Sequence, residues 1–404
     1  MDIIMKHMKD YDIYDENHPF FRDQLVRPTL VEVHISDLHF GAMDPKYQFK
    51  ILSEQFLDKI ENMRFDILSI DGDLFHHKFL SNQDSVMYAT LFINRTIEIC
   101  KKFDATLVLL HGTYEHDAGQ LRLFYHYLSD PTIDIRIVEE VKFEYIKGAK
   151  ILCIPELYGR GKEYYDKFLY ASCYDSVFMH GEIRGAIYNP SREDKGLDTI
   201  GSPIFSIEDF ALCRGPIISG HIHTPGCFNS YFYYCGSPYR WQFGEEEDKG
   251  FLIVLHNLET QQHYVHMEKI ISQRYDTISI QSLMSEDPKK IIQYIDDLQS
   301  QGIDYIRIDA GENIEDKYIP TIEILKSYYK TNNRIKFKNT INKNKIESTK
   351  MNKEALTKFK DYDYILNPNM SPYEIFCRYV NQQEKCEFIT VKELKEILKS
   401  VKKV

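Results

Sequence analysis

Five short stretches of the chain carry aspartate, glutamate and histidine residues that could bind divalent metal ions. They are HISDLHFG with Asp37 and His39, IDGDLFHH with Asp73, HGTYEHD with Glu115 and His116, FMHGEI with His180, and SGHIHTPG with His221 and His223. Hard divalent ions such as Mn²⁺ bind carboxylate oxygen and imidazole nitrogen, so these side chains are of a suitable chemical type. Each stretch is a weak signal by itself. Their joint occurrence, each at the end of a predicted strand, predicts a metal site.

The chemistry that such a site could perform is hydrolysis of a phosphate ester. Two divalent ions about 3.5–4 Å apart can share a carboxylate and a hydroxide, and the hydroxide can attack phosphorus in line. No cysteine is needed for this reaction. The eight cysteines are scattered singly without a CxxC pair, and we expect them to be reduced and buried.

The spacing within two of the stretches favours convergence of their side chains. Asp37 and His39 are two residues apart at a predicted strand end, as are His221 and His223. Successive side chains of a strand point to opposite faces, so the two members of each pair can point to the same side.

The elements that must position these residues begin at Leu30. Apolar runs predict strands at 30–36, 65–73 and 105–112, and helical spacing predicts helices at 47–63 and 85–103. This alternation is typical of an α/β layered domain. Shorter strands follow, and their hairpin-like spacing predicts a second sheet that packs on the first as a sandwich with outer helices. These shorter strands are expected at 135–141, 143–146, 149–156, 175–183, 215–223, 231–237 and 251–257.

The rhythm restarts near residue 274, which predicts a second, smaller α/β domain. The last piece of the chain is expected to be helical, because two capping boxes begin at Ser371 and Thr390. We therefore predict four parts. They are an N-terminal extension (1–29), a main domain (30–272), a small α/β domain (273–340), and a basic linker with a helical tail (341–404).

Composition and charge exclude some classes of protein. The net charge of −11 over 404 residues argues against a globally basic nucleic-acid binder. Residues 326–360 nevertheless hold 11 Lys and Arg residues against two acidic ones, so this stretch is either a solvated connector or a contact for a phosphate backbone. We find no run of eighteen apolar residues and no signal-peptide core, so we expect a cytoplasmic protein without a membrane association.

The order of the five stretches resembles the signature of the calcineurin-like metallophosphoesterase superfamily, which reads DxH, GD, GNH(D/E), H and GHxH. The likeness covers residues 35–225. One branch fits better, because residues 234–254, YCGSPYRWQFGEEEDKGFLIV, are similar to the segment after GHxH in SbcD-type nucleases, the nuclease subunits of a DNA double-strand-break repair complex. The residues that carry this second likeness are Ser237, Pro238, Phe243, Gly244, Glu245, Lys249 and Gly250.

The resemblance implies a fold and a function. The fold would be a two-sheet β-sandwich flanked by helices, followed by a capping domain that holds DNA and by helices that dock on the coiled coil of an SMC-like ATPase. The activity would be that of a Mn²⁺-dependent, or Mg²⁺-dependent, 3′-to-5′ exonuclease and single-strand endonuclease in DNA repair and recombination. The family also implies a homodimer. The setting would be the nucleoid of a bacterial or phage-infected cell.

The resemblance also implies roles for the ligand residues. Asp37, His39 and His223 would bind one metal ion, His180 and His221 would bind the other, and Asp73 would bridge both. His116 would lie near the scissile phosphate and stabilise the transition state or protonate the leaving oxygen.

The third stretch departs from the family pattern. The asparagine expected before His116 is absent, Glu115 stands in its place, and Thr113 and Tyr114 are inserted after Gly112. A glutamate oxygen is a good ligand for a hard cation, so we predict that Glu115 completes the second metal shell. The alternative is that Glu115 faces solvent and that Thr113 or a water molecule fills the shell.

Two other functions remain open at this point. The chain could be a phosphatase or cyclic-nucleotide phosphodiesterase of the same superfamily, which would hydrolyse p-nitrophenyl phosphate without cutting DNA. It could instead be a non-catalytic DNA-binding scaffold, which would bind DNA with one metal ion or fewer per chain.

Overall fold

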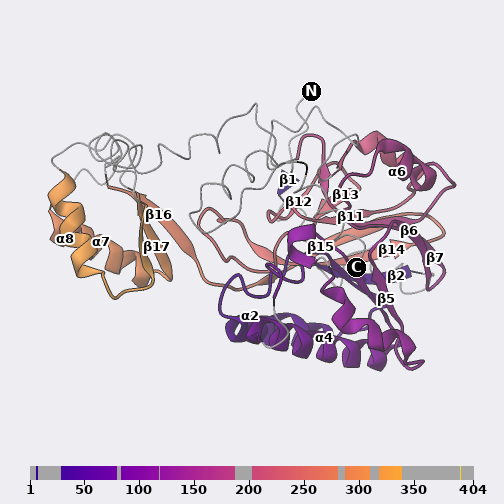
Figure 1. The fold of residues 1–404 in the computed structure, drawn as a ribbon, viewed down its shortest axis with the longest axis horizontal. Helices are drawn as coiled ribbons and strands as arrows, with labels where there is room; N and C mark the ends of the chain where they lie inside the picture. The colour runs from indigo at the N-terminus through magenta and orange to yellow at the C-terminus, as the bar shows by residue number, and fades with distance from the viewer. Residues whose placement is uncertain are drawn as a thin grey trace. The chain divides into compact units, whose positions relative to one another are not determined.

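The computed structural model describes residues 6–7, 29–79, 83–117, 119–186, 203–280, 287–309, 318–338 and 392. The described chain is a mixed α/β protein, which confirms the coarse fold class predicted from the sequence (Figure 1). The predicted N-terminal extension, basic linker and C-terminal helices lie outside the described residues, apart from residues 6–7, 29 and 392. None of the helices in the described ranges is both long and apolar enough to cross a membrane.

The chain divides into two compact units. The first holds the described residues up to Thr277 together with Asp296–Ile306, and the second holds Ile278–Ile295 and the described residues from Arg307 onward. The division that we predict after residue 272 stays a prediction.

The first unit contains a six-stranded sheet of order β15-β14-β2-β3-β4-β5. Strands β2 to β5 run parallel, whereas β14 is antiparallel to both β2 and β15. Every residue of β3 and β4 is buried, as expected for parallel strands whose two faces are both covered. The strands are β2 (Thr29–Ile35), β3 (Ile67–Asp71), β4 (Thr106–Leu110), β5 (Ile135–Val138), β14 (Lys249–Asn257) and β15 (His263–Ile270).

The membership of this sheet corrects one prediction. We expected the strands at 135–141 and 251–257 in a second sheet, but β5 pairs with β4 and β14 pairs with β2. All nine residues of β14 are buried, because a strand placed between two others is covered on both edges as well as on its faces. We did not predict β15, whose apolar residues are interrupted by histidine, glutamate and lysine.

A seven-stranded sheet of order β1-β12-β13-β11-β8-β7-β6 forms the second layer of the first unit. Its strands β7, β8, β11 and β13 are parallel, and β6 and β7 form a hairpin. The hairpin turn has positive φ at Lys147 (50°) and Gly148 (91°), the geometry of a tight two-residue connection. The strands are β1 (Lys6–His7), β6 (Lys142–Ile146), β7 (Ala149–Ile154), β8 (Ser176–His180), β11 (Ile217–Gly220), β12 (Gly226–Cys227) and β13 (Phe232–Tyr234). A short parallel pair, β9 (Glu182–Ile183) and β10 (Ile204–Phe205), follows β8 in the chain.

The two sheets pack face to face. One buried apolar cluster joins Ile67, Val108 and Leu110 of the six-stranded sheet to Ile151 and Phe178 of the seven-stranded one. Helices cover the outer faces, with α2 and α4 on one side of the sandwich and α6 on the other (Figure 1). The helices and helical turns of this unit are α2 (Pro45–Leu52), η2 (Ser53–Leu57), α3 (Asp58–Ile60), α4 (Asp84–Phe103), α5 (Tyr114–Asp117), η3 (Leu121–Ser129), α6 (Lys162–Leu169) and η5 (Ile207–Phe210).

The sequence explains where the two largest helical segments begin and end. Asp44 caps α2, because its carboxylate accepts a hydrogen bond from the main-chain N–H of Lys46 over 2.9 Å, and Pro45 starts the helix. The helix then continues through the π-helical turn η2 into α3. Helix α4 ends at Asp104, which has a left-handed conformation (φ 54°), and two lysines in its last turn suit the negative end of the helix dipole.

A three-stranded sheet of order β16-β17-β18 follows in the chain. It is accompanied by two helices, whose apolar residues Ile291, Ile295, Ile322 and Leu325 are buried. The elements are β16 (Tyr275–Ser279), α7 (Pro288–Ser300), β17 (Tyr305–Asp309), α8 (Ile319–Tyr328) and β18 (Ile335–Lys338). This order of strand, helix, strand, helix and strand agrees with the order predicted from the sequence.

Candidate metal centre

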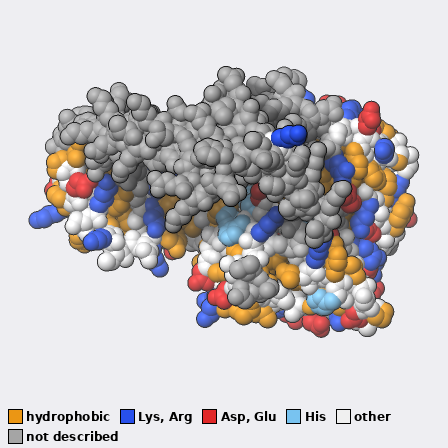
Figure 2. All heavy atoms as spheres, in the orientation of Figure 1, with side chains coloured by type: hydrophobic (Ala, Val, Ile, Leu, Met, Phe, Trp, Pro, Cys, Tyr) orange, Lys and Arg blue, Asp and Glu red, His pale blue; other side chains and the backbone are white. Residues whose placement is uncertain are grey.

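Asp37, His39 and His223 lie together in the first unit. Asp37 and His39 follow β2, and His223 follows β11. The Nε2 atoms of His39 and His223 are 3.1 Å apart, and Nε2 of His223 is 3.9 Å from Oδ1 of Asp37. Asp37 and His39 are buried and His223 is nearly so, so three potential ligand atoms face one small volume. Figure 2 shows several histidine side chains gathered on one face.

Asp73 lies between this group and a second one. Its Oδ2 atom is 3.6 Å from Nε2 of His39 and 3.5 Å from Nε2 of His180. His180 is the last residue of β8, and its ring centroid is 5.3 Å from that of His221, which follows β11. A carboxylate placed between two sets of histidines is the geometry of a bridging ligand.

The main chain at several of these residues is in an unusual conformation. Asp37, His39, Asp73 and His221 all have positive φ values, of 52°, 46°, 53° and 85°. Residues other than glycine rarely adopt this left-handed region, and each such residue costs of the order of 1 kcal/mol or more. We had predicted that Asp37 and His39 alternate along a strand, but β2 ends at Ile35 and the loop itself turns both side chains inward.

Two glycines allow the strand ends to approach closely. A Cβ atom on Gly72 would lie 2.2 Å from Nδ1 of His180, and one on Gly112 would lie 2.2 Å from the main-chain nitrogen of Asp73. Gly72 also has a φ of +91°. Side chains at these two positions would therefore push the ligand residues apart.

Three of the histidines are held at their second ring nitrogen. Nδ1 of His180 donates to the carbonyl of Asp71 over 2.7 Å. Nδ1 of His223 is 3.1 Å from Oε1 of Glu245, and Nε2 of His221 is 3.3 Å from Oε1 of Glu182. Hydrogen bonding at one nitrogen turns the other toward the centre, as is usual for histidines that bind metals.

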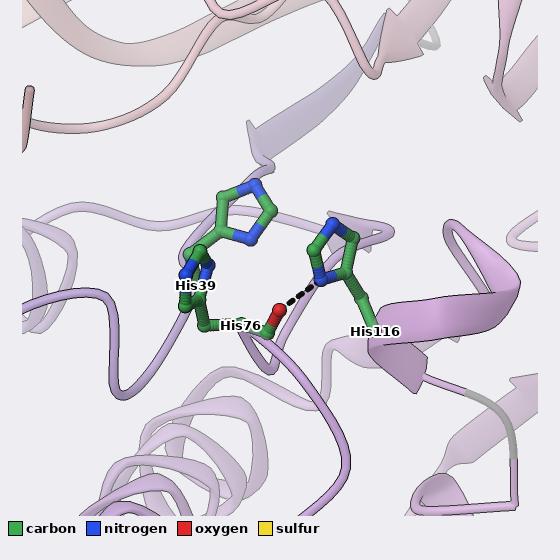
Figure 3. Close-up of side chains that lie close together, drawn as sticks. All are labelled: His39, His76 and His116. Carbon is green, nitrogen blue, oxygen red and sulfur yellow. Dashed lines mark hydrogen bonds between the residues drawn. The ribbon is translucent and has the colours of Figure 1, made fainter. Parts of the chain in front are cut away.

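His116 lies on the short helix α5, next to the same centre. Its Nδ1 donates to the main-chain carbonyl of His76, which leaves Nε2 available, and Figure 3 shows the two residues beside His39. Nε2 of His116 is 3.9 Å from Oδ2 of Asp73. The ring is part-exposed rather than buried, so it stands between the buried centre and solvent.

Glu115 is not brought into either group. Its side chain is exposed, and its Oε2 accepts a hydrogen bond from the hydroxyl of Tyr158 over 3.2 Å. Thr113 lies closer to the centre, because its N–H donates to Oδ1 of Asp73 over 2.6 Å and its Oγ1 is 3.2 Å from Oδ2 of the same residue. In this structure Glu115 therefore faces away from both groups, whereas Thr113 lies beside Asp73.

Three glutamates of the site were missed from the sequence. Glu156 groups with His180 and His221, while Glu182 and Glu245 orient histidines. Glu156 lies at the end of the predicted strand at 149–156, so its position at a strand end was the one available signal. Glu182 follows His180 by two residues. Glu245 lies in the segment 234–254, and its residue type alone predicts no role.

A network of buried polar side chains lies under the centre in the six-stranded sheet. Nδ1 of His34 is 2.8 Å from Oδ2 of Asp71, and its Nε2 is 3.2 Å from Oε2 of Glu32. Burial opposes charge on both partners of the His34–Glu32 pair. The carboxylate of Asp71 nevertheless raises the pKa of His34 to about 9, and hydrogen bonds with His256 and His34 lower the pKa of Glu32 to about 2. The pair is therefore ionised near neutral pH.

The donor set fits divalent metal ions. The described ion pairs of Asp37 and Asp73 are all with histidines, so no lysine or arginine among the described residues pairs with these buried carboxylates. Burying a carboxylate costs several kcal/mol. Without a metal ion the histidines offset this cost at Asp73, because its carboxylate raises the pKa of His180 to about 10 against the opposing effect of burial, and a divalent cation would offset it in their place. Burial lowers the pKa of His39 well below its usual value, and the nearby His223 lowers it further, so the ring is neutral, which is the ligand form.

Comparisons with known proteins add little to this geometry. No protein-family model matches the chain, and no curated protein matches it. Among solved structures, TT1561 of Thermus thermophilus is 14% identical with a TM-score of 0.35, and the match covers 59% of this chain and 99% of that one. A cold-active protein-tyrosine phosphatase of a psychrophilic Shewanella species is 12% identical with a TM-score of 0.28, over 60% of this chain and 80% of that one. At TM-scores this low, the matches assign neither a family nor a function to this chain.

Proposed function

We propose that this chain is a two-metal phosphodiesterase that cuts DNA. The observation that carries the proposal is the position of Asp73, whose carboxylate oxygen lies 3.6 Å from Nε2 of His39 and 3.5 Å from Nε2 of His180. One ion would be held by Asp37, His39 and His223, and the other by His180 and His221, with Asp73 shared between them.

The roles of the protein groups follow from this arrangement. Two bound divalent ions would supply a hydroxide nucleophile and stabilise the charge on the phosphate oxygens. His116 donates from Nδ1 to the carbonyl of His76, so its Nε2 is the atom that would face the substrate. A protonated Nε2 would donate a hydrogen bond to the phosphate or a proton to the leaving oxygen.

A cavity beside the centre has room for part of a nucleotide. Its volume is about 580 Å³, within the usual range for ligand sites. The two tyrosines of the lining have ring centroids 6.4 Å apart and are partly exposed, so they offer faces on which a base could stack. The lining residues are His111, Tyr114, Gly119, Arg122, Glu139, Glu140, Glu156, Leu157, Tyr158, Gly159 and Arg160.

DNA is the substrate that we favour, for two further reasons. Residues 234–254 are similar to the corresponding segment of SbcD-type nucleases. The basic stretch 326–360 also begins within the described residues, where Lys330, Arg334 and Lys336 are exposed. Lysine and arginine gathered in this way bind phosphate backbones. The proposal includes a partner of the SMC-like ATPase class, a homodimer, and Mn²⁺ or Mg²⁺ as the metal.

The test is cleavage of a 3′-labelled linear duplex and of a labelled single strand by the purified full chain with Mn²⁺. We expect the wild type to degrade DNA and Asp73→Asn to lose the activity. Asp84→Asn is the matched control, because Asp84 is exposed in the first turn of α4.

The same preparation separates the alternatives. Hydrolysis of p-nitrophenyl phosphate without any DNA cleavage would replace the nuclease by a phosphatase. If the protein binds DNA but leaves both the duplex and the single strand intact, with and without an added ATPase partner, the scaffold function would replace the nuclease.

A further inference from the structure

Glu156 is a buried carboxylate at the centre that no sequence motif marks. It follows β7 after Pro155, is 1% exposed, and its main-chain N–H donates to the carbonyl of His111 over 3.3 Å. Its Oε2 atom lies 3.3 Å from Nδ1 of His221 and 3.6 Å from Nε2 of His180. One carboxylate oxygen therefore faces ring nitrogens of two histidines.

We propose that Glu156 is a metal ligand, which supplies a carboxylate oxygen to the divalent ion held by His180 and His221. The inference rests on the proposed two-metal function and completes its second shell. It also replaces the expectation that Glu115 fills this position, because Glu115 is exposed and its carboxylate accepts a hydrogen bond from Tyr158.

The orientation of both histidines suits a metal site. Nδ1 of His180 donates to the carbonyl of Asp71, and Nε2 of His221 is held by Glu182. Each ring is thus fixed at the nitrogen that points away from Glu156, and each turns its other nitrogen toward the glutamate. Rings that are fixed from behind, with their second nitrogens converging on a carboxylate oxygen, are typical of metal ligands with their supporting contacts.

Thr113 explains how Glu156 is held in this position. The hydroxyl of Thr113 lies 3.0 Å from Oε2 of Glu156 and 3.2 Å from Oδ2 of Asp73, so it can hydrogen-bond either carboxylate. The two carboxylates both lie near Nε2 of His180, at 3.5 Å for Asp73 and 3.6 Å for Glu156. Together they give a shell of two nitrogens and two carboxylate oxygens, which suits Mn²⁺, Fe²⁺ or Zn²⁺ and carries more negative charge than a shell with a neutral amide.

The test measures metal binding rather than catalysis. The full chain is freed of metal with a chelator and titrated with Mn²⁺, and free Mn²⁺ is followed by electron paramagnetic resonance. We expect two ions per wild-type chain. Glu156→Gln keeps the shape of the side chain but loses its charge, and it should weaken one of the two sites about 10- to 100-fold while leaving the other unchanged. The matched variant Glu115→Gln should bind both ions as the wild type does.

Three results would overturn the assignment. Glu156→Gln could bind both Mn²⁺ ions with the affinities of the wild type, or Glu115→Gln could be the only variant in which one site is weakened. The wild type could also bind fewer than two Mn²⁺ ions. Circular dichroism of the metal-free proteins checks that the variants are folded. If Glu156→Gln does not fold, Glu156→Asp replaces it, because it keeps the charge but withdraws the oxygen by one methylene. That variant should lose affinity at one site, and wild-type affinity at both would again contradict the assignment.

Failure of the proposed function would be recognised separately. A wild type that binds two ions, loses one in Glu156→Gln and cleaves neither DNA nor a phosphate monoester would contradict the phosphodiesterase function but support the ligand assignment. If the wild type cleaves DNA but Glu156→Gln binds Mn²⁺ as the wild type does, the phosphodiesterase function would be supported and the ligand assignment contradicted.

Discussion

The Nδ1–H of His180 donates a hydrogen bond to the main-chain carbonyl of Asp71 over 2.7 Å. This bond joins the end of β8 to the end of β3 across the two sheets, and it turns Nε2 of His180 toward Asp73, 3.5 Å away. The contact depends on Gly72, because a Cβ atom there would lie 2.2 Å from Nδ1 of His180.

Gly72→Ala should therefore weaken metal binding although Gly72 is not a ligand. The added methyl group would displace His180, and loss of such a supporting contact lowers metal affinity about 10- to 100-fold. Mn²⁺ titration of the metal-free protein measures the change. Gly148→Ala is the control, because Gly148 has the same φ of +91° but no neighbour closer than 3.9 Å. Equal Mn²⁺ affinity in the two variants would show that His180 does not depend on this packing.

His116→Gln should separate catalysis from metal binding. We expect kcat for DNA cleavage to fall about 10²- to 10⁴-fold, because Nε2 of His116 would no longer act on the phosphate or the leaving oxygen. Mn²⁺ affinity should stay unchanged, since His116 is not among the proposed ligands. His77→Gln serves as the control, because the side chain of His77 is exposed in the same region. A loss of Mn²⁺ binding in His116→Gln would instead make this residue a ligand.

The buried pair of Glu32 and His34 should make stability depend on pH. Asp71, His256 and the ring of Phe178 also face this pair. The pKa of His34 is raised from 6.5 to about 9, so its contribution to stability is fully present below pH 6.5 and is lost as the pH rises through 9. The pKa of Glu32 is lowered from 4.5 to about 2, so its contribution is present above pH 4.5 and is lost as the pH falls through 2.

His34→Gln tests this dependence. Removing one partner of a buried ion pair costs about 3–5 kcal/mol, so the free energy of unfolding of the metal-free protein should fall by that amount at about pH 6. The difference between variant and wild type should shrink above about pH 9, where the wild-type ring loses its charge. Urea denaturation at both pH values measures it, with the exposed His126→Gln as control. A difference that does not change with pH would mean that His34 is neutral in the folded protein.

Neutralising the basic residues of the second unit should weaken DNA binding and its dependence on salt. Each phosphate contact that is lost reduces the slope of log affinity against log salt by about 0.9. The double variant Lys330→Gln, Lys336→Gln removes two exposed charges, and Lys46→Gln, Lys50→Gln removes two from α2 as a control. Fluorescence anisotropy with a labelled duplex at several salt concentrations gives both slopes. Equal slopes in the two variants would mean that DNA does not contact Lys330 and Lys336.

The sequence alone was enough to predict the local elements and several of the residues that the structure brings together. Strands β2, β3 and β4 were predicted from apolar runs, and helix α4 was predicted from helical spacing. Both signals are local, because they depend only on residues that are neighbours in the chain. The metal-ligand residue types likewise stand near strand ends, and the carboxyl ends of parallel strands meet at one edge of a sheet, so convergence within each sheet could be anticipated. The packing of the two sheets, which brings His180 and His221 to Asp73, could not.

The tertiary structure decided which strands pair and which carboxylate faces the second group of histidines. Strand β14 pairs with β2, with Leu252 opposite His34 and Asn257 opposite Thr29. The paired residues are more than two hundred positions apart in the chain, and the composition of β14 does not predict which strand it pairs with.

Glu115 and Glu156 are both glutamates close to a strand end, and the sequence favoured the one nearer the family motif. The helix α5 turns Glu115 outward, whereas the pairing of β7 with β8 carries Glu156 to His180. The physical reason is that contacts between distant segments decide which side chain reaches the histidines, and the local sequence pattern does not encode those contacts.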